Sequence, residues 1–244
     1  MTPFTWPNGK RAAVSLTFDD ARLSQIDTGM AILNAHDVRA TFYIQPSNVG
    51  ARLQGWKQAI AQGHEIGNHT LSHPCSGNFE WSRGNALEEY TIGAIEQEML
   101  RANAYIEETF AIKPVTFAYP CGQTTIGRGR FAESYVPLVA KHFWVGRGYR
   151  AEGCNDPNFG DLALAYGLGA DDIAFEQIKP WVDQAAASGG WLITCHHEVG
   201  ADGQRLSTRP DVLTALCQYV SDPANGIWVD TVKNIAAYVR ANRA

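Results

Sequence analysis

Short runs of β-branched and aromatic residues alternate with longer amphipathic stretches along this chain. The short runs predict strands at 12–18, 40–44, 64–70, 115–120, 142–146, 164–169, 191–197 and 226–231. The longer stretches predict helices at 26–36, 53–62, 85–110, 131–140, 173–188, 209–221 and 231–242. Strands that alternate with helices are typical of repeated βα units around a parallel sheet, so the pattern predicts an α/β protein.

Polar segments rich in Gly and Asn separate some of these elements. They lie at 74–85, 121–130, 146–161 and 198–210, and each follows a predicted strand. Because the C-terminal ends of parallel strands meet at one end of a barrel, we expect these segments to form the loops that carry a site. No repeat, low-complexity tract or linker composition divides the sequence, so residues 1–244 are expected to form a single domain.

Composition narrows the choice of partner and location. The net charge is −5 and the cations are not clustered, which argues against nucleic acid because phosphate contacts need clustered Lys and Arg. No run approaches the roughly 18 apolar residues of a membrane span. The first residues lack the basic and apolar regions of a secretory signal. We therefore expect no membrane association and a cytoplasmic location for the chain as given, or secretion if a signal was removed.

The chain has an odd number of cysteines, and none forms a CxxC motif. They are Cys75, Cys121, Cys154, Cys195 and Cys217. A chain of this size does not need disulfides to stabilise its core, so reduced thiols are expected. If two of them do pair, Cys121 and Cys154 are the first candidates.

Two adjacent carboxylates, Asp19 and Asp20, end the strongly apolar first strand. Successive side chains of a strand point to opposite faces, so two neighbouring carboxylates share a site only where the strand ends and the backbone turns. The alternative interpretation is that Asp20 caps the following segment.

The segment His69-Thr70-Leu71-Ser72-His73 follows the third predicted strand. Two imidazoles four residues apart meet on one side of a helical turn, and a neutral imidazole nitrogen is a good ligand for Zn²⁺ and similar metals. The alternative is a pair of surface histidines. His64 does not share this spacing and is interpreted as a strand residue.

A later apolar strand, Trp191 to His197, ends in two histidines. With a period of two, Cys195 and His197 share one face, whereas Thr194 and His196 share the other. A strand-end histidine is either a satisfied core residue or, at the site end of a barrel, a general acid. Together the two carboxylates, the spaced histidine pair and this histidine supply the groups that hydrolysis at one metal needs.

At these residues the sequence resembles the polysaccharide deacetylase family, also called the NodB homology group or carbohydrate esterase family 4. The segment TFDDA (Thr17 to Ala21) is similar to the TFDDG motif of the family, and HTLSH (His69 to His73) matches its HS/TxxH motif. The resemblance runs in order from residue 17 to the strand that ends at His197.

The resemblance implies a distorted (β/α) barrel of seven or eight strands, NodB-like, that binds one divalent metal. Carried over to this sequence, Asp20, His69 and His73 are the metal ligands and Asp19 is the catalytic base. The metal is expected to be Zn, with Co or Ni as alternatives. The late LxH motif is matched only loosely, and His197 is assigned as the general acid with His196 as the alternative.

The third family motif, RxPxG, is altered in this chain. The segment reads Ala118-Tyr119-Pro120-Cys121-Gly122, so Ala118 replaces an Arg that orients the catalytic Asp, and the resemblance implies that Tyr119, Pro120, Cys121 and Gly122 contact the substrate. Without a replacement cation the pKa of Asp19 would rise. The candidate replacements in site-end loops are Arg128, Arg130, Arg147 and Arg150.

Two further features of the family have candidate counterparts. A carboxylate that supports the general acid corresponds to Asp171 or Asp172, for which N-capping of the next helix is the alternative. Aromatic residues that could stack on sugar rings, rather than lie in the core, are Trp56, Trp81, Tyr119 and Trp144.

The resemblance implies hydrolytic removal of N-acetyl or O-acetyl groups from a carbohydrate, as in an acetylated amino-sugar polymer or acetyl-xylan. Because the third motif is altered, hydrolysis of a small amide or cyclic imide is an alternative. An inactive carbohydrate-binding homologue is a third interpretation. The number of subunits does not follow from the sequence.

Overall fold

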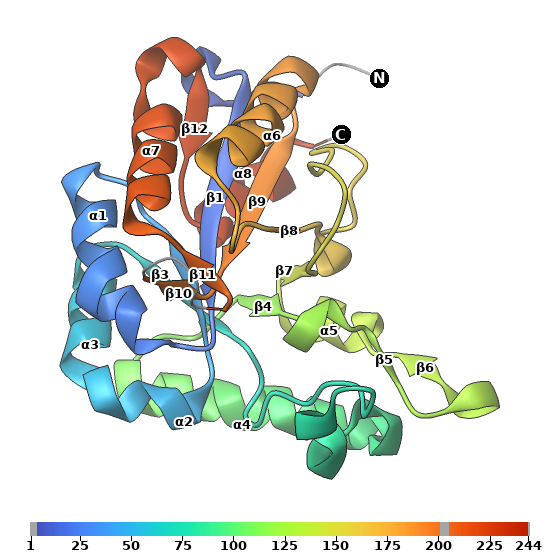
Figure 1. Ribbon diagram of the computed structural model, residues 1–244. Coiled ribbons are helices and arrows are strands. Elements are labelled where there is room, and N and C mark those ends of the chain that lie inside the picture. Colours follow the sequence, from blue (N-terminus) through green and yellow to red (C-terminus); the bar gives the residue numbers. More distant parts are fainter. Residues whose placement is uncertain (1–3, 201–204, 244) are drawn as a thin grey trace.

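The computed structural model of this chain describes residues 4–200 and 205–243. Part of the predicted loop at 198–210, residues 201–204, lies outside the described residues. Figure 1 shows central strands with helices around them. The helices are α1 Met30–Ala35, α2 Pro46–Val49, α3 Leu53–Ala61, α4 Ile92–Phe110, α5 Val136–His142, α6 Phe175–Ser188, α7 Pro210–Ser221 and α8 Val232–Asn242. A π-helical turn, Gln25–Gly29, leads into α1.

The main sheet is parallel in all its pairings. Its strands are β1 Ala12–Asp19, β2 Thr41–Ile44, β3 Glu65–Asn68, β4 Thr116–Ala118, β7 Val145–Arg147, β8 Leu168–Gly169, β9 Trp191–His196 and β12 Ile227–Val229. They lie in the order β7-β4-β3-β2-β1-β9-β8, and β12 pairs with the start of β1. Two small sheets lie apart from it: antiparallel β5 Thr125–Ile126 with β6 Glu133–Ser134, and parallel β10 Glu198–Val199 with β11 Ser207–Thr208.

The two ends of the main sheet approach each other. The backbone N–H of Gly148, just after β7, donates to the carbonyl of Ala165 at 2.8 Å, and the N–H of Ala165 donates to the carbonyl of Gly146 at 2.8 Å. Ala165 lies only three residues before β8, so these bonds connect the β7 edge with the segment that enters β8. The sheet is thus curled into the distorted (β/α) barrel that the sequence predicts.

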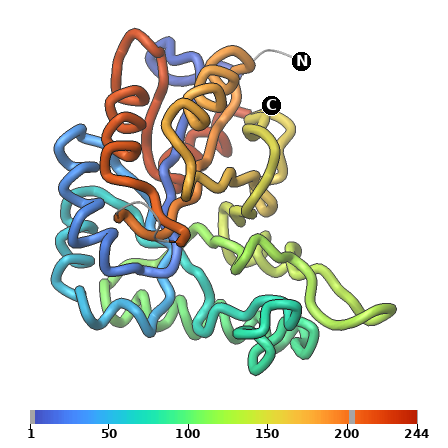
Figure 2. Tube along the Cα trace, in the orientation of Figure 1, coloured from blue at the N-terminus to red at the C-terminus, as the bar shows by residue number. Residues whose placement is uncertain are grey.

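All eight predicted strands are present, whereas two predicted helices begin later than expected. Helix α4 starts at Ile92 rather than at 85, because the Thr91 side chain caps it by accepting a hydrogen bond from the N–H of Ala94 at 3.2 Å. Helix α5 starts at Val136 rather than at 131, because the β5–β6 hairpin occupies residues 125–134. Figure 2 shows this hairpin projecting from the body of the molecule.

Strand β1 is buried along its whole length, and its two faces differ in chemistry. Val14, Leu16 and Phe18 join the apolar core beneath the helices. The alternate residues Ser15 and Thr17 face the barrel interior and are hydrogen-bonded there, Thr17 Oγ1 to the carbonyl of Thr194 at 2.7 Å. Because the side-chain period of a strand is two, Asp19 continues this polar interior row.

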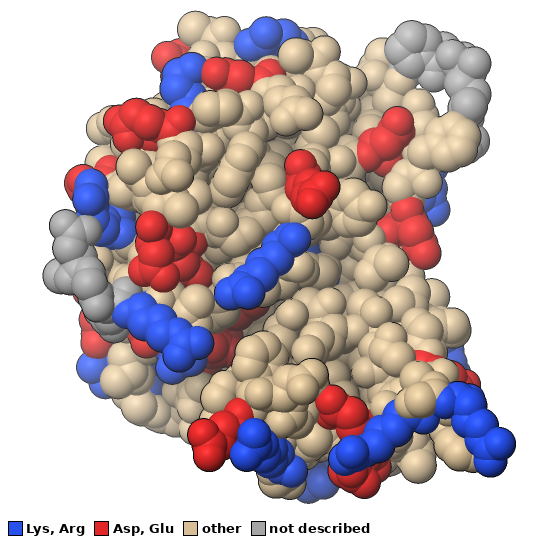
Figure 3. Space-filling view, turned by 45° about the vertical axis from the view of Figure 1, so that its right-hand side comes forward, with Lys and Arg blue, Asp and Glu red and all other residues tan. Residues whose placement is uncertain are grey.

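Charged side chains of both signs are mixed on the molecular surface (Figure 3). In Figure 3, basic and acidic side chains are interspersed over the face in view, and neither sign gathers in one continuous patch there. In the described parts of the chain, no helix is both long enough and apolar enough to span a bilayer.

The inner layer of the barrel depends on a glycine. A Cβ on Gly67 in β3 would lie 2.5 Å from Tyr43 Cδ1 and 2.8 Å from Thr116 Oγ1, both of which are fully buried. A contact of this kind forces neighbouring strands or rotamers to shift, since protein interiors are close-packed.

We predict that Gly67→Ala lowers the free energy of unfolding by about 1–3 kcal/mol, as overpacked cores do. Gly93→Ala is the matched control, because Gly93 lies in the first turn of α4 with no atom within 4 Å of the added Cβ. Urea unfolding in the presence of a chelator would measure both variants. Equal stability of the two would refute this account of the barrel interior.

Candidate active site

The two carboxylates at the end of β1 reach one cleft because the backbone turns between them. Asp19 is the last residue of β1, and Asp20 and Ala21 follow with φ angles of 73° and 53°. This left-handed conformation is uncommon for residues other than glycine. It ends the strand alternation, so the side chain of Asp20 is not forced to the face opposite Asp19. Two hydrogen bonds hold this turn. Gln25 Nε2 donates to the carbonyl of Asp19 at 2.6 Å, and Asn48 Nδ2 donates to the carbonyl of Asp20 at 2.8 Å.

Asp20 lies against both histidines of the HTLSH segment. Its Oδ1 is 3.5 Å from His69 Nε2 and 3.4 Å from His73 Nε2, and the two rings meet edge to face with centroids 4.7 Å apart. The segment is a loop after β3 rather than the expected helical turn, because Thr70 and His73 have φ angles of 63° and 55°. The four-residue spacing therefore brings the imidazoles together through an irregular loop.

Protonation and hydrogen bonding prepare these side chains to bind a cation. The Nδ1 atom of His69 donates to the carbonyl of Ala118 at 2.9 Å, which leaves its Nε2 with a free lone pair. Burial, and then the neighbouring His69, lower the pKa of His73 to about 4, so that its ring is neutral. Arg22 Nη2 holds Asp20 Oδ2 at 2.9 Å, but Oδ1 is buried without a hydrogen-bond partner among the described residues.

The donor set therefore fits a divalent metal. A buried carboxylate oxygen that faces two imidazole nitrogens and has no donor is costly unless a cation satisfies it. Ligand atoms of Asp20, His69 and His73 all lie within 4.8 Å of one another. Two nitrogens and one oxygen, with room left on the cleft side, are typical of catalytic zinc-type sites.

Asp19 is paired with Arg147, which comes from β7. The Nη2 atom of Arg147 contacts Asp19 Oδ1, and the Arg147 side chain is completely buried. Burial alone would raise the pKa of Asp19, but the Arg147 charge, followed by His69 and His197, lowers it to about 2. The same charge pair raises the pKa of Arg147.

Arg147 supplies the cation that Ala118 lacks. Ala118 and Arg147 are direct register partners on the adjacent strands β4 and β7. The arginine therefore lies at the same level of the barrel as the position that Ala118 occupies, but on the neighbouring strand. The other candidates make different contacts. Arg128 pairs with Glu89 and Arg130 lies over the Phe131 ring. Arg150 lines the cleft, where it lies over the Tyr149 ring.

The two histidines at the end of β9 differ completely in environment. His196 is fully buried, stacks on Phe18, and is hydrogen-bonded through both ring nitrogens, to Thr208 Oγ1 at 2.7 Å and Thr194 Oγ1 at 2.9 Å. Burial lowers the pKa of His196 to about 4, as expected for a neutral core histidine. His197, in contrast, lines the cleft together with Asp19 and Asp20.

Asp171 supports His197, and Asp172 does not. Asp171 Oδ2 lies 2.6 Å from His197 Nδ1, and Oδ1 accepts the backbone N–H of His197 at 3.0 Å. Burial would lower the pKa of His197, but the hydrogen bond to Asp171 and then the charge of Asp19 raise it. Asp172 instead accepts the backbone N–H of Leu206 at 3.1 Å. Neither carboxylate caps α6, whose N-cap is Ala174.

One cavity of about 630 Å³ is lined by Asp19, Asp20, His69, His73 and His197. Its wall includes Phe79 and Trp81, which stack on each other with ring centroids 5.5 Å apart, and Trp81 is 61% exposed. Trp56 and Tyr119 are core residues, and Trp144 lies under Arg240. Of the predicted aromatic residues, Trp81 is the one that the structure brings to the cleft.

The altered third motif reaches the cavity at one point. Cys121 lines it, whereas Tyr119 is buried and donates its hydroxyl to the carbonyl of Ala163 at 2.6 Å. Pro120 is buried as well. Gly122 has a φ angle of 70° and lies against the backbone of Tyr149, where a Cβ would be 2.7 Å from the nitrogen.

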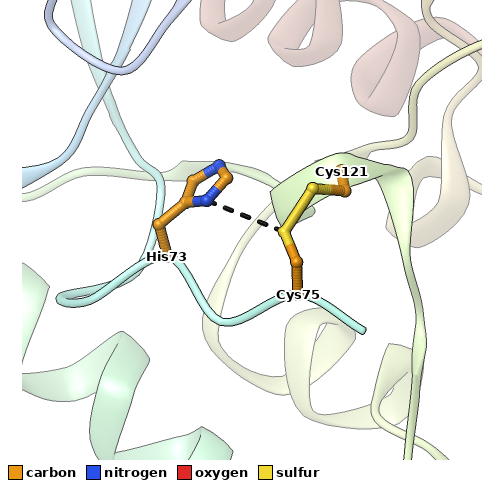
Figure 4. A group of neighbouring side chains, drawn as sticks. All are labelled: His73, Cys75 and Cys121. Carbon is orange, nitrogen blue, oxygen red and sulfur yellow. Dashed lines mark hydrogen bonds between the residues drawn. A yellow bond between two sulfur atoms is a disulfide. The ribbon is translucent and has the colours of Figure 1, made fainter. Parts of the chain in front are cut away.

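The expected cysteine chemistry is wrong in two respects. Cys75 and Cys121 form a disulfide, and Cys154 is a free thiol. Cys154 could not pair with Cys121, because the neighbouring Asn155 is hydrogen-bonded to Trp191 at the start of β9, at the opposite end of the barrel from the residues after β4. The HTLSH loop and the loop after β4 converge instead, which brings Cys75 to Cys121 (Figure 4).

Some cleft residues could not be identified from the sequence. Arg22 contacts the Asp20 carboxylate, and Glu198 lines the same cavity with its Oε1 3.9 Å from Arg22 Nη1. These two residues lie 176 positions apart in the chain. For Phe79 the sequence does offer an indication. Phe79 and Trp81 are two aromatic residues in a Gly- and Asn-rich segment, which is unusual for a loop exposed to solvent. The stacking of Phe79 on Trp81 follows from the fold.

Comparison with known proteins connects this geometry to a family. The family model for polysaccharide deacetylases matches residues 7–130, which are 124 of the 244 residues. The uncharacterized protein YlxY of Bacillus subtilis is 34% identical over 93 residues, 38% of this chain and 26% of YlxY. A peptidoglycan-N-acetylglucosamine deacetylase of Bacillus cereus is 36% identical over 83 residues, 30% of this chain and 30% of that protein.

The fold is shared with solved structures. A Mycobacterium smegmatis protein classed with the polysaccharide deacetylases superposes with a TM-score of 0.71 at 17% identity, over 99% of this chain and 94% of that chain. The two sequence relatives are matched over only about a quarter to a third of their own length. Because the family model covers more than half of this chain and its motifs converge in one cleft, the chain belongs to the polysaccharide deacetylase family.

Proposed function

We propose that residues 1–244 form one catalytic domain, a metal-dependent hydrolase that removes acetyl groups from a carbohydrate. The bond is the amide of an N-acetylated amino sugar or the ester of an O-acetylated chain. One observation carries the proposal: the buried Asp20 Oδ1, which has no partner among the described residues, faces Nε2 of both His69 and His73 beside a paired carboxylate. Family membership supports the reaction class.

Asp20, His69 and His73 would hold the metal, Zn or alternatively Co or Ni. When bound, a divalent metal supplies a Lewis acid that polarises the acetyl carbonyl and makes a nearby water more acidic. The metal that occupies such a site depends on availability as well as on ligand type.

Asp19 would take the proton from the attacking water. Arg147 holds Asp19 Oδ1, which leaves Oδ2 on the side of His69, 3.9 Å from its Nε2. The oxygen that accepts the proton is thus directed toward the Asp20–His69–His73 side of the cleft. Arg147 also keeps the carboxylate ionised although burial opposes the charge.

His197 would protonate the departing amine or alcohol. Asp171 occupies its Nδ1, so Nε2 is the nitrogen that remains to donate a proton. The backbone N–H of Cys121, at the edge of the same cavity, has no acceptor in the described parts of the chain. It would stabilise the oxyanion of the tetrahedral intermediate, as unoccupied backbone donors do in acyl-transfer sites.

The cleft favours a sugar over a small imide. Trp81 presents an exposed face beside His73, with ring centroids 6.2 Å apart, and a flat ring of this kind packs well against a pyranose. Ala118 in place of an arginine favours an altered pocket and hence an imide substrate, but Arg147 restores the missing charge beside Asp19. The Arg147–Asp19 pair therefore reduces the support for imide hydrolysis.

We predict that mass spectrometry of product mixtures detects acetate release from acetylated chitin, peptidoglycan or xylan oligomers with defined metal added. Chelation or Asp20→Ala should reduce turnover by at least roughly 10²-fold, because the carbonyl then lacks its Lewis acid. Asp27→Ala is the control, since Asp27 is a surface residue paired with Arg52. Turnover of cyclic imides alone, or sugar binding without acetate release, would contradict the proposal.

We predict that Arg147→Ala lowers kcat/KM by roughly 10²-fold and moves the acid limb of its pH profile upward. The sign follows from the buried charge pair: the base form of Asp19 exists above its pKa of about 2, and without Arg147 the desolvation that remains raises that pKa. The proton-accepting form is then lost at a higher pH.

A second-site change tests the same assignment. Because Ala118 and Arg147 are register partners, the double variant Ala118→Arg with Arg147→Ala should recover part of the activity and return the acid limb toward the wild-type position. An unchanged acid limb in Arg147→Ala would show that the guanidinium does not tune Asp19.

We predict that Asp171→Asn moves the basic limb of kcat to lower pH and reduces kcat. The Asp171 carboxylate raises the pKa of His197, so its loss deprotonates the general acid at a lower pH. Asp172→Asn should leave the profile in place, because in the described part of the chain Asp172 accepts backbone N–H groups of residues 206 and 207 rather than a group of His197. Identical profiles for both variants would remove His197 from the role of general acid.

A further inference from the structure

The Cys75–Cys121 disulfide lies on the side of the His73 ring that faces away from Asp20. Cys75 Sγ is 3.7 Å from His73 Nδ1 (Figure 4). On the other side of the same ring, Nε2 faces Asp20 Oδ1 at 3.4 Å. A histidine that binds a metal ordinarily donates its other N–H to a carbonyl, a carboxylate or water. His69 does so with Ala118, but the sulfur of Cys75 is the contact of His73 Nδ1 in the described residues.

The three side chains have the geometry of a metal site once the sulfurs are separated. Ligand atoms of His73, Cys75 and Cys121 lie within 4.8 Å of one another. Bond lengths of about 2.3 Å to thiolate and 2.1 Å to imidazole place such atoms roughly 3.6 Å apart around a tetrahedral metal. The observed separation of Cys75 Sγ and His73 Nδ1, 3.7 Å, is close to that value.

We propose that reduction of the Cys75–Cys121 disulfide opens a second metal site, made of both thiolates and His73 Nδ1, that prefers soft divalent metals. The fourth position would face the cavity, which Cys121 lines. Thiolate ligands select metals such as Zn²⁺ and Cd²⁺ over hard cations. This site does not depend on the proposed deacetylase reaction.

The reduction needs a thiol as co-reactant, and the cleft gives it access. A thiolate from solution attacks the Cys121 sulfur, because Cys121 is partly exposed and Cys75 is completely buried. The S–S bond breaks and Cys75 leaves as a thiolate. A second thiol displaces Cys121, so two thiols are oxidised to one disulfide and two cysteine thiols form. Binding of a divalent metal then releases their two protons.

The second site competes with the Asp20–His69–His73 site for one imidazole. A neutral imidazole has one lone pair and one N–H. When Nδ1 binds a metal, Nε2 carries the proton and becomes a donor toward Asp20 Oδ1. Only Asp20 and His69 would then remain for the first site. This competition, unlike the thiolate site itself, rests on the metal centre proposed above.

Cadmium provides a probe that does not depend on activity. The full chain is titrated with Cd²⁺ in its oxidised form, and again after reduction with a dithiol and anaerobic removal of that dithiol. The oxidised chain has three free thiols and the reduced chain five. We expect ultraviolet thiolate-to-cadmium absorption and protection of two thiols in the reduced chain only. NMR of the His73 ring should show the proton on Nε2.

Matched cysteine variants locate the signal. Cys121→Ala should reduce the cadmium absorption by at least half, whereas Cys154→Ser removes a different thiol and should leave it unchanged. Absence of the absorption in the reduced wild-type chain, or its full strength in Cys121→Ala, overturns the thiolate site. The comparison of oxidised and reduced wild-type chain needs no variant to fold.

The two proposals fail separately. Acetate release by the oxidised chain tests the deacetylase function, and its absence leaves the cadmium result untouched. A thiolate signal without a proton on His73 Nε2 overturns the competition but not the second site. If the oxidised chain releases acetate and the reduced chain binds Cd²⁺ with the proton on His73 Nε2, a further result follows. The reduced chain loaded with Cd²⁺ should lose acetate release, and it should regain this activity after chelation of Cd²⁺ and reoxidation of the disulfide.

Discussion

The buried ion pair between Asp19 and Arg147 is the interaction on which this site depends. A guanidinium with no exposed surface is tolerated only when it is paired, and removing one partner of such a pair costs about 3–5 kcal/mol. The partners lie on β1 and β7, which are separated by three strands in the sheet order. The sheet must therefore curl for the pair to form, and the pair in turn holds Asp19 in place at the end of β1.

The site is built from loops in which several non-glycine residues adopt the left-handed conformation. Asp20, Ala21, Thr70, His73 and Cys121 all have positive φ angles. Such conformations are unfavourable for residues with a Cβ and tend to concentrate where function requires a particular geometry. Asp20, His73 and Cys121 line the cavity, whereas Ala21 packs in the apolar core and Thr70 accepts the backbone N–H of His73. The regular strands beneath hold these loops at one end of the barrel.

His73 connects the two chemical features of the cleft. One ring nitrogen faces the carboxylate of Asp20, and the other faces the disulfide that ties the HTLSH loop to the loop after β4. The disulfide therefore fixes the relative position of a candidate metal ligand and the Cys121 backbone. The oxidation state of two cysteines and the coordination of one histidine are linked by contact.

Local sequence determined the strands, the family and the grouping of Asp19, Asp20, His69 and His73, because alternation, strand ends and short spacings are properties of neighbouring residues. Only the tertiary structure decided which arginine replaces the one missing at Ala118, since Arg147 reaches Asp19 through the register of β4 and β7. The Cys75–Cys121 pair and the late start of α5 have the same origin. Each depends on which distant segments become neighbours when the sheet curls. Hydrophobic periodicity is a property of residues close together in the sequence, so it does not specify these long-range contacts.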